Sequence, residues 1–192
     1  AARLGGRVAA MLLHNAAMLD QWAGALGRAV RRAVADGRIE ATGVAVYTPE
    51  EFVRALDVEG ISIIQAPFNA LDRALLEQGL LGQARRHGKA VHLRSVFLQG
   101  LLTMDAPPPF AAEDIRPWRT LCERHGRAPQ DAALQFAAQA TDAALVFGVD
   151  SEEQLAANMG ALRGAALTPD FMDAIRALPT PEERVIRPYL WN

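Results

Sequence analysis

Five short apolar segments of this 192-residue chain end in residues that could bind or react with a ligand. In chain order, these residues are His14 with Asn15, Val46 with Tyr47, Gln65 with Asn69, Arg94 with Ser95, and Gly148 with Asp150. An imidazole N–H can donate a hydrogen bond to an oxygen on which negative charge develops, and a planar guanidinium can stack on a flat ring. These segment ends are therefore candidate positions for a functional site, if the fold brings them together.

The apolar segments predict β-strands. We expect strands at residues 7–13, 42–47, 61–65, 90–93 and 143–147. Unbroken hydrophobicity, as in the first of these, is typical of a parallel strand that is covered on both faces. Arg94 and Ser95 stop the fourth strand abruptly, and the chain then runs to Gly100 through an expected loop.

Helices are expected between the strands. Apolar residues at helical spacing, capping boxes, proline at helix starts and glycine at helix ends predict them. The ranges are 19–36, 49–56, a helix within 75–87, 113–125, 129–140, 151–162 and 168–178. The proline-containing tail at residues 179–192 should be irregular and pack across the body of the protein.

Strands that alternate with helices predict βα repeats around a parallel sheet. The chain holds five such repeats, whereas a closed barrel of this kind has eight repeats and typically about 250 residues. We therefore expect an α/β fold that is part of a (β/α)8 TIM barrel, truncated so that the N-terminal repeats are absent. The barrel portion would span residues 1–178, followed by a C-terminal tail at 179–192. A smaller open sheet with helices on both faces is the alternative.

Two consequences follow from a partial barrel. Working groups in such barrels lie at the carboxyl ends of the strands, so the five sets of residues would line one rim. An arc of five repeats would also leave two sheet edges open to pairing with another chain. We expect the missing repeats, or self-association, to cover those edges.

The bulk composition limits the classes of partner. A net charge of −2 gives no electrostatic reason to expect nucleic acid or an anionic membrane surface as a partner. No apolar run reaches the roughly 18 residues of a membrane span, and we see no signal peptide, so a cytoplasmic location is expected. Cys122 is the single cysteine, and neither it nor the histidines have a spacing that predicts a metal site.

Five stretches, in order and at consistent spacing, resemble the C-terminal portion of the aldo-keto reductase family. They are residues 12–15, 37–39 with 43–46, 65–69, 94–102 and 148–158. The resemblance implies an oxidoreductase that reduces an aldehyde or ketone with NADP(H), or alternatively NAD(H). In this family a hydride passes from the nicotinamide to the carbonyl carbon, and a tyrosine gives a proton to the oxygen.

By this resemblance, His14 matches the active-site histidine, which orients or polarises the carbonyl. The family's catalytic Asp, Tyr and Lys come from the first strands of the barrel, a region that is absent from this sequence. Tyr47 does not replace the tyrosine, because it follows the second strand here. Taken alone, a single histidine after an apolar strand is more often a structural residue.

The resemblance also assigns cofactor contacts. Gln65 matches the glutamine that binds the nicotinamide amide, and Arg94 matches the residue whose flat side chain packs on the nicotinamide ring. The loop along the pyrophosphate would hold Ser95, Phe97, Gln99 and Gly100, and the adenosine end would hold Gly148, Val149, Asp150, Gln154 and Asn158. There, the helix that starts at Ser151 would offer N–H groups and a favourable dipole to an anion.

Simpler readings of these residues stay open. Gln65 and Asn69 could satisfy main-chain groups at a strand end, and Arg94 could pair with a carboxylate such as Asp72. Departures from the family's pattern are Ala45 and Val46 in place of Ser and Asn, and Gly148 and Gln154 in place of Lys and Arg. The alternative function is a truncated, non-catalytic relative that acts as a dinucleotide-binding or protein-interaction module.

Overall fold

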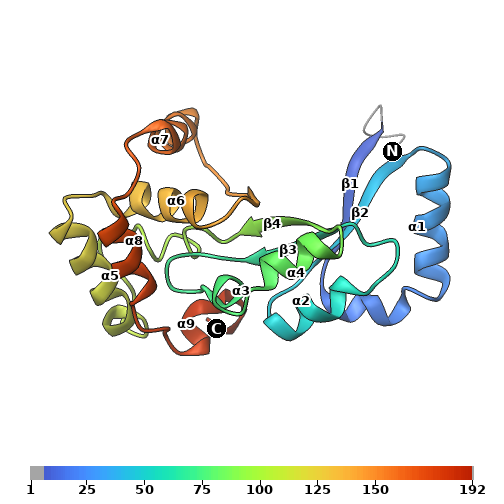
Figure 1. The fold of residues 1–192 in the computed structure, drawn as a ribbon, viewed down its shortest axis with the longest axis horizontal. Coiled ribbons are helices and arrows are strands. Elements are labelled where there is room, and N and C mark those ends of the chain that lie inside the picture. The colour runs from blue at the N-terminus through green and yellow to red at the C-terminus, as the bar shows by residue number, and fades with distance from the viewer. Residues whose placement is uncertain (1–6, 192) are drawn as a thin grey trace. The chain divides into compact units, whose positions relative to one another are not determined.

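The computed structural model describes residues 7–191, in which a parallel sheet alternates with helices (Figure 1). The strands are β1 (Val8–Leu13), β2 (Ile39–Ala45), β3 (Ile63–Pro67), β4 (Ala90–Arg94) and β5 (Ala144–Leu145). They follow one another in the sheet in chain order, β1-β2-β3-β4-β5. The described strands therefore form an open sheet with β1 and β5 at its two ends, which confirms the expected α/β class.

The helical elements fill the intervals between the strands. They are η1 (Ala16–Gln21), α1 (Ala25–Ala35), α2 (Pro49–Leu56), α3 (Ala74–Glu77), α4 (Leu80–Arg86), α5 (Ala112–Arg124), α6 (Pro129–Ala140), α7 (Glu152–Arg163), α8 (Pro169–Arg176), α9 (Glu183–Ile186) and η2 (Pro188–Leu190). The predicted helices 49–56 and 129–140 are confirmed to the residue. Each of these two begins with proline directly after its N-cap, a position where the missing N–H costs nothing.

The chain divides into two compact units, and each unit is built from two separate segments of the chain. The first unit comprises Ala1–Ala66 and Gln78–His92, and the second comprises Pro67–Glu77 and Leu93–Asn192. The unit boundaries fall inside β3 and β4, so each of these strands passes from the first unit to the second. We describe each unit by itself.

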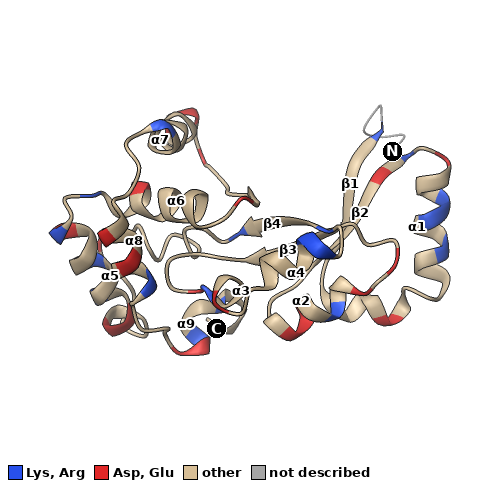
Figure 2. Ribbon diagram, in the orientation of Figure 1, with Lys and Arg blue, Asp and Glu red and all other residues tan. Residues whose placement is uncertain are grey.

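Glycines lie at the starts of two helices of the first unit. The predicted helix 19–36 is split into η1 and α1 at Gly24, which caps α1 in an extended conformation. The helix expected within 75–87 is α4, which begins after Gly79, whose φ of 65° is left-handed. The arginines of α1 are exposed (Arg28, Arg31 and Arg32), and Figure 2 shows basic residues of this helix in blue.

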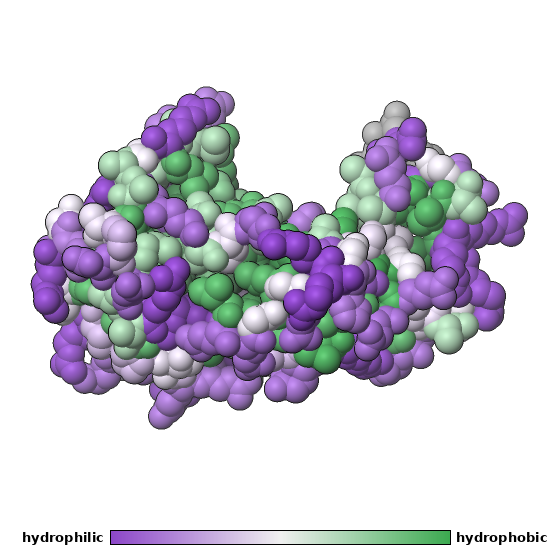
Figure 3. Space-filling view, in the orientation of Figure 1, coloured by the Kyte–Doolittle hydropathy of each residue, from purple (hydrophilic) through white to green (hydrophobic). Residues whose placement is uncertain are grey.

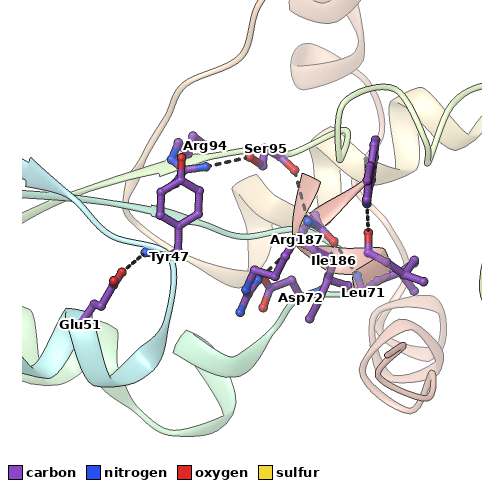
Figure 4. Close-up of polar contacts among 11 residues, drawn as sticks. Tyr47, Glu51, Leu71, Asp72, Arg94, Ser95, Ile186 and Arg187 are labelled. Carbon is purple, nitrogen blue, oxygen red and sulfur yellow. Dashed lines mark hydrogen bonds and ion pairs between the residues drawn. The ribbon is translucent and has the colours of Figure 1, made fainter. Parts of the chain in front are cut away.

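The start of α2 shows how a local signal fixes a helix. Thr48 accepts a hydrogen bond from the Glu51 N–H (3.3 Å), which is half of a capping box. The Glu51 carboxylate accepts from the Tyr47 N–H (2.6 Å), one residue before the cap (Figure 4). The first interaction satisfies a main-chain donor that the first turn of a helix leaves unpaired, and the second fixes the residue that precedes the cap.

The second unit contains an aromatic and aliphatic core beneath α5, α6 and α8. Phe68 stacks on Phe136 with ring centroids 5.8 Å apart. The buried Trp118 donates its indole N–H to the Leu102 carbonyl (3.0 Å). Around β5 and α7, by contrast, several large apolar side chains stay exposed, and Figure 3 shows hydrophobic surface below α7. These are Val146, Val149, Leu155 and Met159.

The C-terminal tail is more ordered than expected. Residues 179–192 were expected to be irregular, but the structure forms α9 and η2 there. The reason is burial: Val185 and Ile186 enter the core of the second unit, and Arg187 pairs with Asp72. A sequence rich in proline and charge hides these few apolar anchors.

Within residues 7–191, no helix is long and apolar enough to cross a membrane. In the same range, no three or more His, Cys, Asp or Glu side chains are grouped so that they could hold a metal ion.

The buried Cys122 should be unreactive in the folded protein. Burial, with a smaller effect from Glu123, raises the pKa of the Cys122 thiol to about 12, so almost no thiolate forms near neutral pH. We expect no reaction with Ellman's reagent at pH 8 in buffer. In about 8 M urea, which exposes the core of a typical protein, one equivalent should react. A Cys122→Ser variant should give no signal in either condition. Stoichiometric reaction of the folded protein would contradict the burial.

Candidate functional site

In the first unit, the strand register places three candidate positions in one row. Ala45 lies opposite Gln65, and Leu13 lies opposite Val44, in parallel pairing. Side chains alternate between the two faces of a strand. His14 follows Leu13 directly, so it continues the row that contains Ala45 and Gln65.

The two faces of this three-stranded part differ in cover. Val44, Val46 and Ile64 are fully buried on one face, whereas Gln65 is half-buried and His14 is exposed. In the described part of the chain, the Gln65 side-chain amide has no hydrogen-bond partner. A half-buried amide with free donors and acceptors fits a polar ligand group such as a carboxamide.

Gly43 allows β2 to lie close to β1 and β3 on the face that carries Ala45 and Gln65. A Cβ on Gly43 would lie 2.6 Å from the Ile63 carbonyl oxygen and 3.0 Å from a side-chain carbon of Leu12. Such distances are too short, so the backbone of β2 can lie this close to its neighbours only without a side chain. The strands that carry His14, Ala45 and Gln65 are therefore tightly packed beside one another.

In the second unit, the chain after β4 forms a strained loop at residues 95–100. Ser95, Leu98 and Gln99 have φ angles of 62°, 49° and 54°, and Gly100 has a φ of 85°. A left-handed conformation costs an ordinary residue roughly 1–2 kcal/mol. Strain of this kind persists only where the surroundings enforce it, and it gathers at binding and catalytic sites.

Buried anchors hold the loop in place. The side chains of Val96, Leu98, Leu101 and Leu102 are buried, with at most 1% exposed. The Leu98 N–H donates to the Ser95 carbonyl (2.9 Å), and the Leu101 N–H donates to the Leu98 carbonyl (3.0 Å). Burial of apolar side chains thus offsets the cost of the left-handed backbone.

The loop presents unused main-chain donors. In the part of the chain that the structure describes, the N–H groups of Val96, Phe97, Gln99 and Gly100 donate to no protein acceptor. Main-chain N–H groups in a run of left- and right-handed residues form concavities that bind anions. Arg94 lies directly before the loop, and its Nη1 donates to the Ser95 hydroxyl oxygen (3.3 Å; Figure 4).

The second unit brings this loop beside the segment that follows β5. The Val146 N–H donates to the Leu93 carbonyl (2.8 Å), which aligns the ends of β4 and β5. Phe97 contacts Phe147 edge to face, with centroids 6.1 Å apart. The sequence-predicted residues Gly148, Val149 and Asp150 come next in the chain and are exposed.

The start of α7 differs from the expected anion site. Ser151 Oγ accepts from the Gln154 N–H (3.2 Å), and the Gln154 side-chain oxygen accepts from the Asp150 N–H (2.8 Å). The main-chain N–H of Glu153 and the Ser151 hydroxyl lower the pKa of the Glu153 carboxyl. The protein's own oxygens thus already occupy several donors that were expected to be available there.

The side chain of Asn158 is buried. It is 2% exposed, and its Oδ1 accepts from Gln130 Nε2 in α6 (2.5 Å). The contact joins α7 to α6. A cofactor role for Asn158 stays a prediction.

The second unit contains a buried polar cluster that the sequence did not reveal, formed by Asp72, Arg73 and Arg187. Asp72 pairs with Arg187 at 2.5 Å, and both side chains are buried (Figure 4). Burial raises the pKa of the Asp72 carboxyl, and the charges of Arg187 and Arg73 offset this only in part. Asp72 thus has a cationic partner other than Arg94, the one that the sequence had offered.

The family model for the aldo/keto reductase family matches residues 11–179. The chain belongs to the aldo/keto reductase family. A comparison with curated protein sequences gives no significant match.

Solved structures of aldo-keto reductases share the fold. The holo and apo forms of an aldo-keto reductase from Bacillus halodurans each have a TM-score of 0.68 at 22% identity; the matches cover 93% of this chain and 64% and 65% of theirs. A glycerol dehydrogenase from Gluconobacter oxydans has a TM-score of 0.66 at 20% identity, with coverage of 91% and 61%. The chain therefore spans less than two thirds of the length of these proteins, and its open sheet is similar to part of the aldo-keto reductase TIM barrel.

Seen as a member of this family, the chain distributes its predicted site residues over both units. His14 and Gln65 belong to the first unit, and the other ten belong to the second. The second unit brings Arg94, the loop and the segment after β5 together. The residue that sequence reasoning left undecided is Asn69, although an Asn side chain often accepts a hydrogen bond from the main chain two residues further on, as Asn69 does from the Leu71 N–H.

Replacement of Gln99 by glycine should stabilise the protein. Gln99 is exposed with a φ of 54°, so glycine removes left-handed strain, partly offset by extra freedom in the unfolded chain. We expect Gln99→Gly to gain about 0.5–1 kcal/mol, or roughly 1–4 °C in melting temperature.

Thermal unfolding followed by circular dichroism would measure the effect. The matched control is Gln139→Gly, which makes the same change at an exposed position inside α6. There, glycine should cost about 1 kcal/mol. A loss of stability at both positions would contradict the strain at Gln99.

Proposed function

We propose that this chain supplies the dinucleotide-binding part and the active-site histidine of an oxidoreductase that reduces an aldehyde or ketone with NAD(P)H. The observation that carries the proposal is the strained loop at residues 95–100, with unused main-chain donors beside Arg94. Family membership supports the reaction class. The full activity is a proposal, because the chain matches only 61–65% of the length of the related structures.

The loop and Arg94 would bind the cofactor's charged and planar parts. The N–H groups of Val96, Phe97, Gln99 and Gly100 would donate to pyrophosphate oxygens, as fixed dipoles that need no rearrangement. The guanidinium of Arg94 would stack on the nicotinamide ring, which a planar cation can do as an aromatic side chain does. Phe97 would help to fix the loop through its contact with Phe147.

The row in the first unit would serve the nicotinamide and the substrate. The half-buried Gln65 amide can exchange hydrogen bonds with a carboxamide, and it has no competing partner in the described residues. When bound, the reduced nicotinamide supplies a hydride to the carbonyl carbon, and the oxygen takes up a proton to give an alcohol. His14 would donate an N–H hydrogen bond to that oxygen, which stabilises the negative charge that develops on it.

The neighbouring structures support a small-molecule substrate. One of them is a glycerol dehydrogenase, whose name places an alcohol and a carbonyl compound on the two sides of its reaction. We extend only this class, a small carbonyl compound or alcohol, to the present chain. The second candidate function is a dinucleotide-binding module without hydride transfer, which the unused main-chain donors of the loop at residues 95–100 would serve equally well.

Replacement of Arg94 by glutamate should weaken dinucleotide binding. The change removes the stacking cation and places a negative charge beside the pyrophosphate loop, so we expect an affinity loss of about tenfold or more. Titration of the protein with NADH and NADPH, followed by the fluorescence of the nicotinamide, would measure it. Turnover of an aldehyde in the same samples separates the two candidate functions.

The control for Arg94→Glu is Arg124→Glu. Arg124 is an exposed residue of α5 in the same unit, so the substitution changes the net charge equally without touching the loop. Equal affinity of wild type and Arg94→Glu would remove Arg94 from the site. Absence of binding by wild type at millimolar NADH and NADPH would overturn the proposal itself.

The start of α7 should disfavour a 2′-phosphate. Asp150, Glu152 and Glu153 are exposed acidic residues there (Figure 2), and the first basic residue along α7 is Arg163. If the adenosine ribose lies at this segment, these carboxylates repel a phosphate and accept hydrogen bonds from a free ribose hydroxyl. We therefore expect NADH to bind more tightly than NADPH.

In a Glu152→Gln, Glu153→Gln double variant, the ratio of the NADPH to the NADH dissociation constant should fall by about threefold or more at low salt. Added salt should reduce the difference in this ratio between the double variant and wild type. Asp170→Asn is the control, because Asp170 occupies the first turn of α8, which is capped by Thr168 in a similar way. Tighter binding of NADPH than NADH by wild type would be the contrary result.

A further inference from the structure

Asn69 is a fully buried polar side chain that connects two segments of the second unit. Its Oδ1 accepts hydrogen bonds from the N–H groups of Leu71 (2.9 Å) and Asp72 (3.0 Å). Its Nδ2 donates to the main-chain carbonyl of Ser95, 26 residues further along the chain, at 3.2 Å. One amide thus closes its own turn and holds a residue of the strained loop.

The carbonyl that Asn69 binds is the pivot of that loop. Ser95 is the first left-handed residue after β4, with a φ of 62°. Its carbonyl also accepts from the Leu98 N–H (2.9 Å), so it is held between two donors. Rotation of this peptide would break both hydrogen bonds and turn the following N–H groups in other directions.

The segment that carries Asn69 is itself firmly fixed. Asp72 is paired with Arg187. Arg73, which is also buried, donates to the carbonyls of Ala70 (2.5 Å) and Leu178 (2.7 Å). Asn69 therefore sits on a rigid support, and the loop is the part whose conformation depends on the hydrogen bond.

We propose that Asn69 is a positioning residue, which holds the Ser95 carbonyl so that the loop at residues 95–100 presents its N–H groups to the dinucleotide. This inference rests on the proposed function, since it assigns to Asn69 the geometry of the same cofactor site. The bond from Nδ2 to Ser95 distinguishes this role from simple closure of the turn at 69–72, for which Oδ1 is sufficient.

An Asn69→Asp variant separates the two roles. Aspartate keeps an oxygen that accepts from Leu71 and Asp72, but it replaces the donor to Ser95 with an oxygen that repels the carbonyl. We expect amide hydrogen exchange in residues 96–102 to become about tenfold faster, and NADH to bind about tenfold more weakly, consistent with the loss of one buried hydrogen bond.

Gln135→Glu is the matched control. Gln135 is a buried amide in the same unit, and its Nε2 donates to the Ala161 carbonyl (2.9 Å). The substitution removes the same kind of hydrogen bond at a comparable cost in stability. It should leave loop exchange and NADH affinity unchanged.

A second variant guards against misfolding and against an effect of the added charge. Asn69→Ser retains a short acceptor for its own turn but cannot reach Ser95, and it introduces no charge. Faster loop exchange and weaker NADH binding in both Asn69→Asp and Asn69→Ser, with thermal unfolding that stays cooperative, would assign the effect to the lost hydrogen bond to Ser95.

The outcomes separate this inference from the proposed function. If wild type binds neither NADH nor NADPH, the proposed function fails, whatever the loop does. If wild type binds but Asn69→Asp and Asn69→Ser leave loop exchange and affinity at wild-type values, the positioning role is overturned while the proposed function stands. Faster exchange with unchanged affinity also overturns the role in binding.

Discussion

The second unit depends on one buried ion pair, Asp72 with Arg187. Two charges removed from water are tolerated only with close partners, and removal of one partner typically costs about 3–5 kcal/mol. The pair fixes the turn at residues 69–73 against the C-terminal tail, and Arg73 adds a hydrogen bond to Leu178. From that support, Asn69 reaches the loop after β4. A charge interaction far from solvent thus supports the backbone of the loop at residues 95–100.

The loop at residues 95–100 shows how backbone strain and side-chain burial combine. Its left-handed residues are unfavourable by themselves, yet Leu98 is both left-handed and fully buried. The apolar side chains fix the loop from below, and the Ser95 carbonyl is held from the side. In the part of the chain that the structure describes, the N–H groups of Val96, Phe97, Gln99 and Gly100 have no protein acceptor, because the fixed backbone does not turn to satisfy them. Such pre-organisation costs stability in the free protein, and under the proposed function it would lower the cost of binding an anion.

Local patterns in the sequence predicted local structure well. Thr48 is the N-cap of α2 and Pro49 is its first residue, so the start of this helix could be predicted from neighbouring residues alone. The five strands and the α/β class followed from similar short segments. The break at Gly24 was missed, because apolar spacing continues through this glycine. Asn69 and Ser95, or Asp72 and Arg187, are 26 and 115 residues apart, and no short pattern reveals such pairs.

The same separation has a consequence for synthesis of the chain. At typical translation rates of ~5–20 residues per second, Arg187 follows Asp72 by roughly 6–23 s, since the two residues are 115 positions apart. During that interval the carboxylate of Asp72 lacks its cationic partner, and the turn at residues 69–73 lacks its support. The first unit contains no residue beyond His92. All residues of the first unit are therefore synthesised before Arg187, the partner on which the turn at residues 69–73 depends.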